Sequence, residues 1–142
     1  MEHPIEFFSE DIEFELKNPD KVSDWIATVI EQHGKELASL TYIFCSDNYL
    51  HEINVEYLDH DTLTDIITFN NADEEGTVEG DIFISVDRIN DNSNDLGVPF
   101  EDELHRVIIH GVLHLLGFKD KTREEEELMR KQEDSSLSLR KF

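Results

Sequence analysis

Residues 107–120 read VIIHGVLHLLGFKD, and this stretch places three metal-binding side chains within eleven residues. His110 and His114 are four residues apart, so on a helix both imidazoles lie on one face and can point at a single ion. Gly117 tolerates the left-handed backbone that ends a helix, which allows the carboxylate of Asp120 to return toward the same ion. Three protein ligands leave a position for water, as in catalytic zinc sites. The sequence therefore predicts a metal centre with the ligands His110, His114 and Asp120.

The residues around the two histidines are apolar on nearly every side, which predicts a central helix over residues 100–116. A histidine on such a helix is often only a satisfied surface or core residue. Two buried imidazoles both need polar partners, however, because an unpaired polar group in an apolar interior costs roughly 1 to 3 kcal/mol. A shared metal ion is the simplest partner for both.

Two neutral imidazoles and one carboxylate leave a zinc-like ion enough positive charge to lower the pKa of its water toward neutrality. The expected reaction is therefore hydrolysis, with metal-bound water as the nucleophile. In zinc proteases with the H-E-x-x-H pattern, the glutamate beside the first histidine is the general base. Gly111 occupies that position here, so the proton acceptor of a protease is missing.

Phosphodiester cleavage needs cations that neutralise the charge of the transition state. Arg106 precedes His110 by one helical turn, and Lys121 directly follows the third predicted ligand. We take both as candidate catalytic cations. Arg106 has an alternative interpretation, an ion pair with Asp102 or Glu103 on its own helix.

Length and composition predict a single domain over residues 1–142. No apolar stretch has the length of a membrane helix, and Met1–Pro4 lacks a basic region followed by an apolar one, so we expect a cytoplasmic protein. The single cysteine, Cys45, cannot form an internal disulfide.

The formal net charge of -22 repels polyanions at long range. An RNA substrate would thus need a local positive cleft, the metal itself or a partner that delivers it.

Hydrophobic patterning alternates between strands and helices along the chain. It predicts strands within residues 4–16, 40–45, 64–69 and 81–85, with a loop or hairpin connection at 70–80. It predicts helices from about 18 to 34, after Ser46 or Asp47 through Tyr57, at 87–94, at 100–116 and from Thr122, where Glu125 completes a capping-box pattern. These elements indicate a small mixed sheet covered by helices, of the α+β or α/β class.

Three motifs, in the same order along the chain, resemble those of the YbeY family. Members of that family are metal-dependent endoribonucleases that take part in ribosomal RNA maturation. Residues 110–118, HGVLHLLGF, are similar to that family's H-G-x-L-H-L-x-G-[YF] signature. Residues 64–69, TDIITF, are similar to its T-[DN]-V-L-S-F strand, and residues 80–82, GDI, to its G-D-I. The likeness spans most of the chain.

The resemblance implies an α+β fold in which the metal helix packs on a mixed sheet of about four strands. It also implies one Zn²⁺-type ion and single-stranded ribosomal RNA as the substrate. The implied action is on the small ribosomal subunit, in processing of the 3′ end of 16S rRNA or in quality control. The implied partners are ribosomal proteins and a ribosome-associated GTPase, in the cytoplasm and without a membrane.

Two positions depart from the family pattern. The third histidine of the family is replaced by Asp120 at the same spacing, and this harder ligand admits Mn²⁺ or Fe²⁺ more readily. The family's arginine after the position of Tyr57 is Leu58 here. We therefore assign its role as a phosphate contact to Arg106 or Lys121.

Three alternatives stay open at this point. The first is a metalloprotease-like zinc hydrolase, and the second is a ribosome-assembly binding module whose metal is structural. The third is an iron oxygenase, because two histidines and one carboxylate also describe the facial iron triad. The third is disfavoured because the predicted ligands come mainly from one helix.

Overall fold

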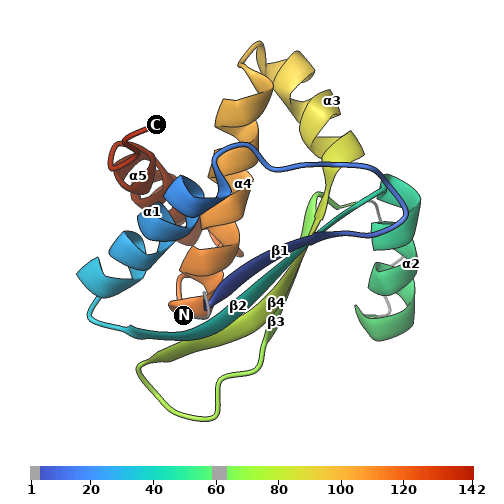
Figure 1. Cartoon of the computed structure of the whole chain (residues 1–142). Helices are drawn as coiled ribbons and strands as arrows, with labels where there is room; N and C mark the ends of the chain where they lie inside the picture. Colours follow the sequence, from blue (N-terminus) through green and yellow to red (C-terminus); the bar gives the residue numbers. More distant parts are fainter. Residues whose placement is uncertain (1–3, 59–63) are drawn as a thin grey trace.

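The structure, a computed structural model, describes residues 4–58 and 64–142 (Figure 1). Residues 1–3, which bear on the expected absence of an export signal, lie outside the described residues. The side chain of Leu58, which replaces the family's arginine, is outside them as well. Within the described residues, no helix is long and apolar enough to cross a membrane.

Four strands form one mixed sheet in the spatial order β1-β2-β4-β3. Strands β1 and β4 each pair in parallel with β2, whereas β3 is an edge strand that pairs antiparallel with β4. The strands are β1 (Ile5–Ser9), β2 (Glu36–Cys45), β3 (Ile66–Asn70) and β4 (Thr77–Ser85). Residues 71–76 form the hairpin connection between β3 and β4, so the connection predicted at 70–80 is present but shorter, and residues 77–80 already belong to β4. The mixed sheet and the α+β class are confirmed.

Helices cover both faces of the sheet (Figure 1). They are α1 (Pro19–Gln32), α2 (Asp47–Leu58), α3 (Val86–Leu96), α4 (Phe100–Leu115) and α5 (Arg123–Leu137). The main core lies between the sheet and the face covered by α1 and α4, and includes Ile82 and Ile84 of β4. A smaller core with Leu50 of α2 and Ile67 of β3 lies on the opposite face. Successive side chains of β4 thus point to opposite faces of the sheet, with Ile82 and Ile84 in the main core and Phe83 in the smaller one.

Helix α4 packs closely on the sheet at Gly111, which faces it. A Cβ atom at Gly111 would lie 3.0 Å from the Cδ1 atoms of both Ile66 and Ile82. The Tyr42 hydroxyl donates a hydrogen bond of 3.0 Å to the carbonyl of Ile108, which ties the helix to β2. These contacts hold the helix that carries His110 against the sheet.

The end of α4 turns as its glycine predicts. Gly117 has φ +106°, and its amide donates to the carbonyl of His114 at 3.0 Å. The amide of Phe118 donates to Leu113 at 3.0 Å, which completes a Schellman-type cap. The chain therefore doubles back and carries Asp120 under the last turns of the helix.

Several predicted elements differ from the structure in their bounds. Strands β2 and β4 each begin four residues before the predicted start, at Glu36 and Thr77 instead of Leu40 and Asp81. Within residues 4–16 only Ile5–Ser9 is a strand. Asp11 has a left-handed backbone with φ 55°, which interrupts the extended chain, and Phe14 beyond it packs against Phe44 without joining the sheet. The helix predicted at 87–94 continues to Leu96, and Gly97 ends it at φ 68°. The alternation of apolar residues up to Leu16 thus reflects the packing of an irregular stretch against the core and not the pairing of a strand.

Candidate metal centre

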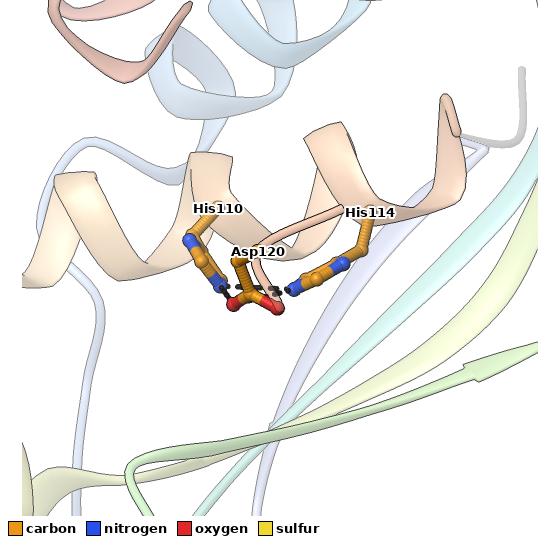
Figure 2. Close-up of side chains that lie close together, drawn as sticks. All are labelled: His110, His114 and Asp120. Atoms are coloured by element: carbon orange, nitrogen blue, oxygen red, sulfur yellow. Dashed lines mark hydrogen bonds and ion pairs between the residues drawn. The ribbon is translucent and has the colours of Figure 1, made fainter. Parts of the chain in front are cut away.

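The three predicted ligands converge on one point (Figure 2). Nε2 of His110 lies 3.0 Å from Nε2 of His114. Oδ2 of Asp120 lies 3.3 Å from each of these two nitrogens. The two histidines come from successive turns of α4, and the carboxylate comes from the segment that follows the Gly117 turn.

This triangle of donor atoms fits a zinc-type ion. Ligands at 2.0 to 2.2 Å in a tetrahedral site are separated from one another by about 3.3 to 3.5 Å. The observed separations of 3.0 and 3.3 Å are within a few tenths of an ångström of that spacing. The side chains of His110, His114 and Asp120 are 20%, 30% and 39% exposed, so one side of the triangle is open to solvent. In the described part of the chain, this is the one group of donor side chains so arranged.

The second ring nitrogen of His110 has a partner that the sequence did not reveal. Its Nδ1 donates a hydrogen bond of 2.7 Å to Oε2 of Glu133, a buried residue on α5. Oε1 of Glu133 accepts from Arg106 at 2.8 Å, and Arg106 also donates to Asp134 at 2.8 Å. Arg106 therefore pairs with α5, not with the alternatives considered on its own helix.

The charges of this network move two pKa values in opposite directions. Burial by itself lowers the pKa of His110, but the hydrogen bond to Glu133 and the negative charges of Glu133 and Asp120 outweigh it and raise the pKa overall. Burial raises the pKa of Glu133, but its hydrogen bonds with His110 and Arg106 outweigh that and lower it overall. Glu133 is accordingly an ionised carboxylate facing an imidazole.

A cleft of about 280 Å³ opens beside the triangle. Burial raises the pKa values of two carboxyl groups in its wall, those of Asp65 and Glu103. Its lining residues are Asp65, Glu103, Arg106, Val107, His110, Asp120, Arg130 and Glu133. Apart from the two arginines, the charged groups of this wall are carboxylates, so the cleft has little intrinsic attraction for a polyanion.

The two candidate catalytic cations differ in their surroundings. The side chain of Arg106 is 24% exposed and reaches the cleft while it holds Glu133 and Asp134. Lys121 is exposed in the segment between α4 and α5, next to Asp120. Nothing in the pattern of residues 107–120 indicated Glu133, because the contact depends on how α5 packs against α4.

Comparison with known proteins gives a consistent result. A family described as "Endoribonuclease YbeY" matches residues 5–140 of the chain. An Endoribonuclease YbeY of Cytophaga hutchinsonii is 50% identical over 141 residues, which is 99% of both chains. One from Amoebophilus asiaticus is 52% identical over 129 residues, covering 91% of this chain and 88% of that one. The solution structure of TM1509 from Thermotoga maritima superposes with a TM-score of 0.64 at 25% identity, over 94% of this chain and 89% of that chain.

Proposed function

This chain belongs to the endoribonuclease YbeY family, and we propose that it is a metal-dependent endoribonuclease specific for single-stranded ribosomal RNA. The observation that supports metal dependence is the convergence of two imidazole nitrogens and a carboxylate oxygen with one open side. A family that cleaves RNA and a site that fits a Lewis-acidic ion point to the same hydrolytic reaction.

In this proposal His110, His114 and Asp120 hold one Zn²⁺ ion, with Mn²⁺ or Fe²⁺ as alternatives that the aspartate allows. When bound, the ion supplies a water of lowered pKa and positive charge beside the phosphodiester. The chain's own part is to keep the three donors converged and to leave the solvent-facing side open for RNA. Water and phosphate must both reach that side, which the partial exposure of all three side chains permits.

Arg106 and Lys121 are the proposed catalytic cations. Two of the five N–H donors of Arg106 are engaged by Glu133 and Asp134, which leaves others for a phosphate oxygen in the cleft. Lys121 extends from the segment of Asp120 and is free to turn toward RNA on the open side. Both assignments are tested by alanine substitution at each position, with metal content measured beside the rate of cleavage.

We propose the same setting that the family resemblance implies: a single domain over residues 1–142, in the cytoplasm, that processes the 3′ end of 16S rRNA on the small ribosomal subunit. The net charge of -22 supports a delivered substrate, since this chain repels free RNA at long range. Ribosomal proteins and a ribosome-associated GTPase are the proposed partners in that delivery.

The deciding experiment compares cleavage of a single-stranded RNA with cleavage of the same sequence as a duplex, with Zn²⁺, Mn²⁺ or Fe²⁺ added to chelator-treated protein. We expect cleavage of the single strand alone, its loss on chelation, and an unchanged circular dichroism spectrum without metal. Cleavage that resists chelation would contradict the metal-dependent mechanism. Unfolding on chelation would indicate a structural metal and favour a binding module.

A further inference from the structure

A buried carboxylate stands behind one of the two histidines and has no counterpart behind the other. Glu133 is 6% exposed and accepts from Nδ1 of His110. Among residues 4–58 and 64–142, no hydrogen bond to Nδ1 of His114 is found, and that side chain is 30% exposed. The two ligands on α4 are therefore held differently.

We propose that Glu133 is a positioning residue of the metal centre, which fixes His110 so that the unprotonated Nε2 faces the ion. A neutral imidazole carries its proton on one of two nitrogens, and the hydrogen bond made by one nitrogen decides which. With Nδ1–H donating to Glu133, the lone pair of Nε2 is directed at His114 and Asp120. The other tautomer would place a hydrogen atom where the ion binds.

Glu133 is itself held in place from two sides. Each carboxylate oxygen has one donor, since Oε2 accepts from His110 and Oε1 from Arg106. Arg106 supplies the positive charge that a buried carboxylate requires, and Asp134 holds its other nitrogen. The helix carrying Glu133 is anchored by Trp25, whose indole N–H donates to the carbonyl of Ser136 at 2.7 Å.

These contacts assign α5 a role in metal binding although it supplies no ligand. Two hydrogen bonds connect these residues, one of 2.8 Å from Arg106 to Glu133 and one of 2.7 Å from His110 to Glu133. Carboxylates that orient metal-bound histidines raise the basicity of the ring as well as fixing its direction, and their loss costs 10- to 100-fold in metal affinity. We expect that range for Glu133.

The test is a titration of the whole chain with Zn²⁺ alone, in competition with a chromophoric chelator. Glu133→Ala should bind Zn²⁺ roughly 10- to 100-fold more weakly than the wild type. Glu133→Gln should fall between the two, because its amide oxygen still accepts from Nδ1 but carries no charge. Asp134→Asn is the matched control, since it removes the negative charge of the other partner of Arg106, keeps an oxygen acceptor for it and does not touch His110, and its affinity should stay within about twofold of the wild type.

A second measurement separates positioning from a general loss of structure. Long-range ¹H–¹⁵N spectra of the metal-free protein at pH 9 report which ring nitrogen of His110 carries the proton. We expect Nδ1–H in the wild type and in Asp134→Asn, and a shift toward Nε2–H in Glu133→Ala. If Glu133→Ala fails to fold, Glu133→Leu, which fills a similar volume and offers no acceptor to Nδ1 of His110, carries both measurements.

The inference rests on the proposed metal centre, and the outcomes distinguish the two. A wild-type protein that binds no Zn²⁺ would overturn the metal centre, and the inference with it. Wild-type binding together with an unchanged affinity and an unchanged His110 tautomer in the Glu133 variants would overturn the inference alone. None of these readouts depends on cleavage of RNA.

Discussion

Two histidines of α4 show how neighbours decide what a buried imidazole does. His105 is 5% exposed, and Nδ1 of its ring accepts a hydrogen bond of 2.9 Å from Arg140. His110, five residues further on, directs its Nδ1 at the carboxylate of Glu133 and its Nε2 at Asp120. His105 thus has a cation at its Nδ1 and a carboxylate, that of Glu101, 3.8 Å from its Nε2, whereas His110 faces anions through both nitrogens.

The consequence is an opposite shift in the two pKa values. Burial and the charge of Arg140 outweigh the negative charge of Asp102 and lower the pKa of His105 to about 4. For His110, burial also lowers the pKa, but the carboxylate partners outweigh it and raise the pKa. Burial is common to both, so the balance of the neighbouring charges and hydrogen bonds decides the outcome. Helix α5 and the tail after it supply both kinds of neighbour, Glu133 for one ring and Arg140 for the other.

The largest expected effect separates the two rings by their ability to bind a metal. His110→Ala removes one of three donors, and we expect Zn²⁺ affinity to fall by roughly a thousandfold, about 4 kcal/mol, with RNA cleavage lost in parallel. Titration against a competing chelator measures the affinity, and a gel assay measures the cleavage.

The matched variant is His105→Gln, which keeps an acceptor for Arg140 and leaves the three donors untouched. Its Zn²⁺ affinity should stay within about threefold of the wild type, below 1 kcal/mol. Equal losses in both variants would show that the helix as a whole, and not the donor set, controls binding.

The next effect concerns pH and tests His105, the histidine of the pair whose pKa is lowered. Its pKa is about 4 in the folded chain against an ordinary value of 6.5, so the unfolded chain binds more protons between these two values. The stability that this difference provides is therefore fully present above pH 6.5 and is lost as pH falls toward 4. We expect a loss of about 3 kcal/mol from this group, measured by urea unfolding of the metal-free protein across that window.

Carboxyl groups titrate in the same window, so the wild-type curve alone does not isolate His105. The difference between the wild type and His105→Gln does, because the variant keeps the other groups. As pH falls from 6.5 to 4, the free energy of unfolding of the wild type should fall by about 3 kcal/mol relative to that of His105→Gln. Curves that remain parallel would show that His105 is not held neutral by its surroundings.

The metal centre also shows which features can be predicted from the sequence alone. The i, i+4 spacing of His110 and His114, the turn at Gly117 and the return of Asp120 are local features, and the structure brings the three residues together as that spacing predicts. The capping box from Thr122 to Glu125 is equally local and is confirmed. Each of these depends on backbone geometry within a few residues.

What the sequence did not reveal depends on packing between distant segments. Glu133 is 23 residues beyond His110 and is one of many acidic residues in a highly charged helix. Its partner Arg106 looked able to pair within α4, but α5 brings carboxylates closer. The extended stretch after Asp11 likewise alternates like a strand but finds no neighbouring strand to join.

A smaller effect tests the close packing on the sheet of α4, the helix that carries His110. Gly111→Ala puts a Cβ atom 3.0 Å from Cδ1 of Ile66 and of Ile82, and we expect a loss of 1 to 3 kcal/mol in unfolding free energy, although alanine is the better helix former. Adding Ile66→Val removes one of the two crowding atoms. The double variant should then be more stable than the two single losses predict, and strict additivity would contradict the proposed crowding.

The smallest expected effect tests whether the first turn of α5 helps to hold Glu133, near the other end of the helix, behind His110. Thr122→Ala removes the hydroxyl that accepts from the amide of Glu125 at 3.1 Å, and should cost about 1 kcal/mol of stability in urea unfolding. Thr122→Ser keeps this acceptor and should stay close to the wild type. Zn²⁺ affinity should change less than threefold in both variants, because Arg106 and the packing of the helix hold Glu133 independently of its first turn. A loss of affinity as large as that expected for Glu133→Ala would mean that the first turn, and not Arg106, keeps the carboxylate behind His110.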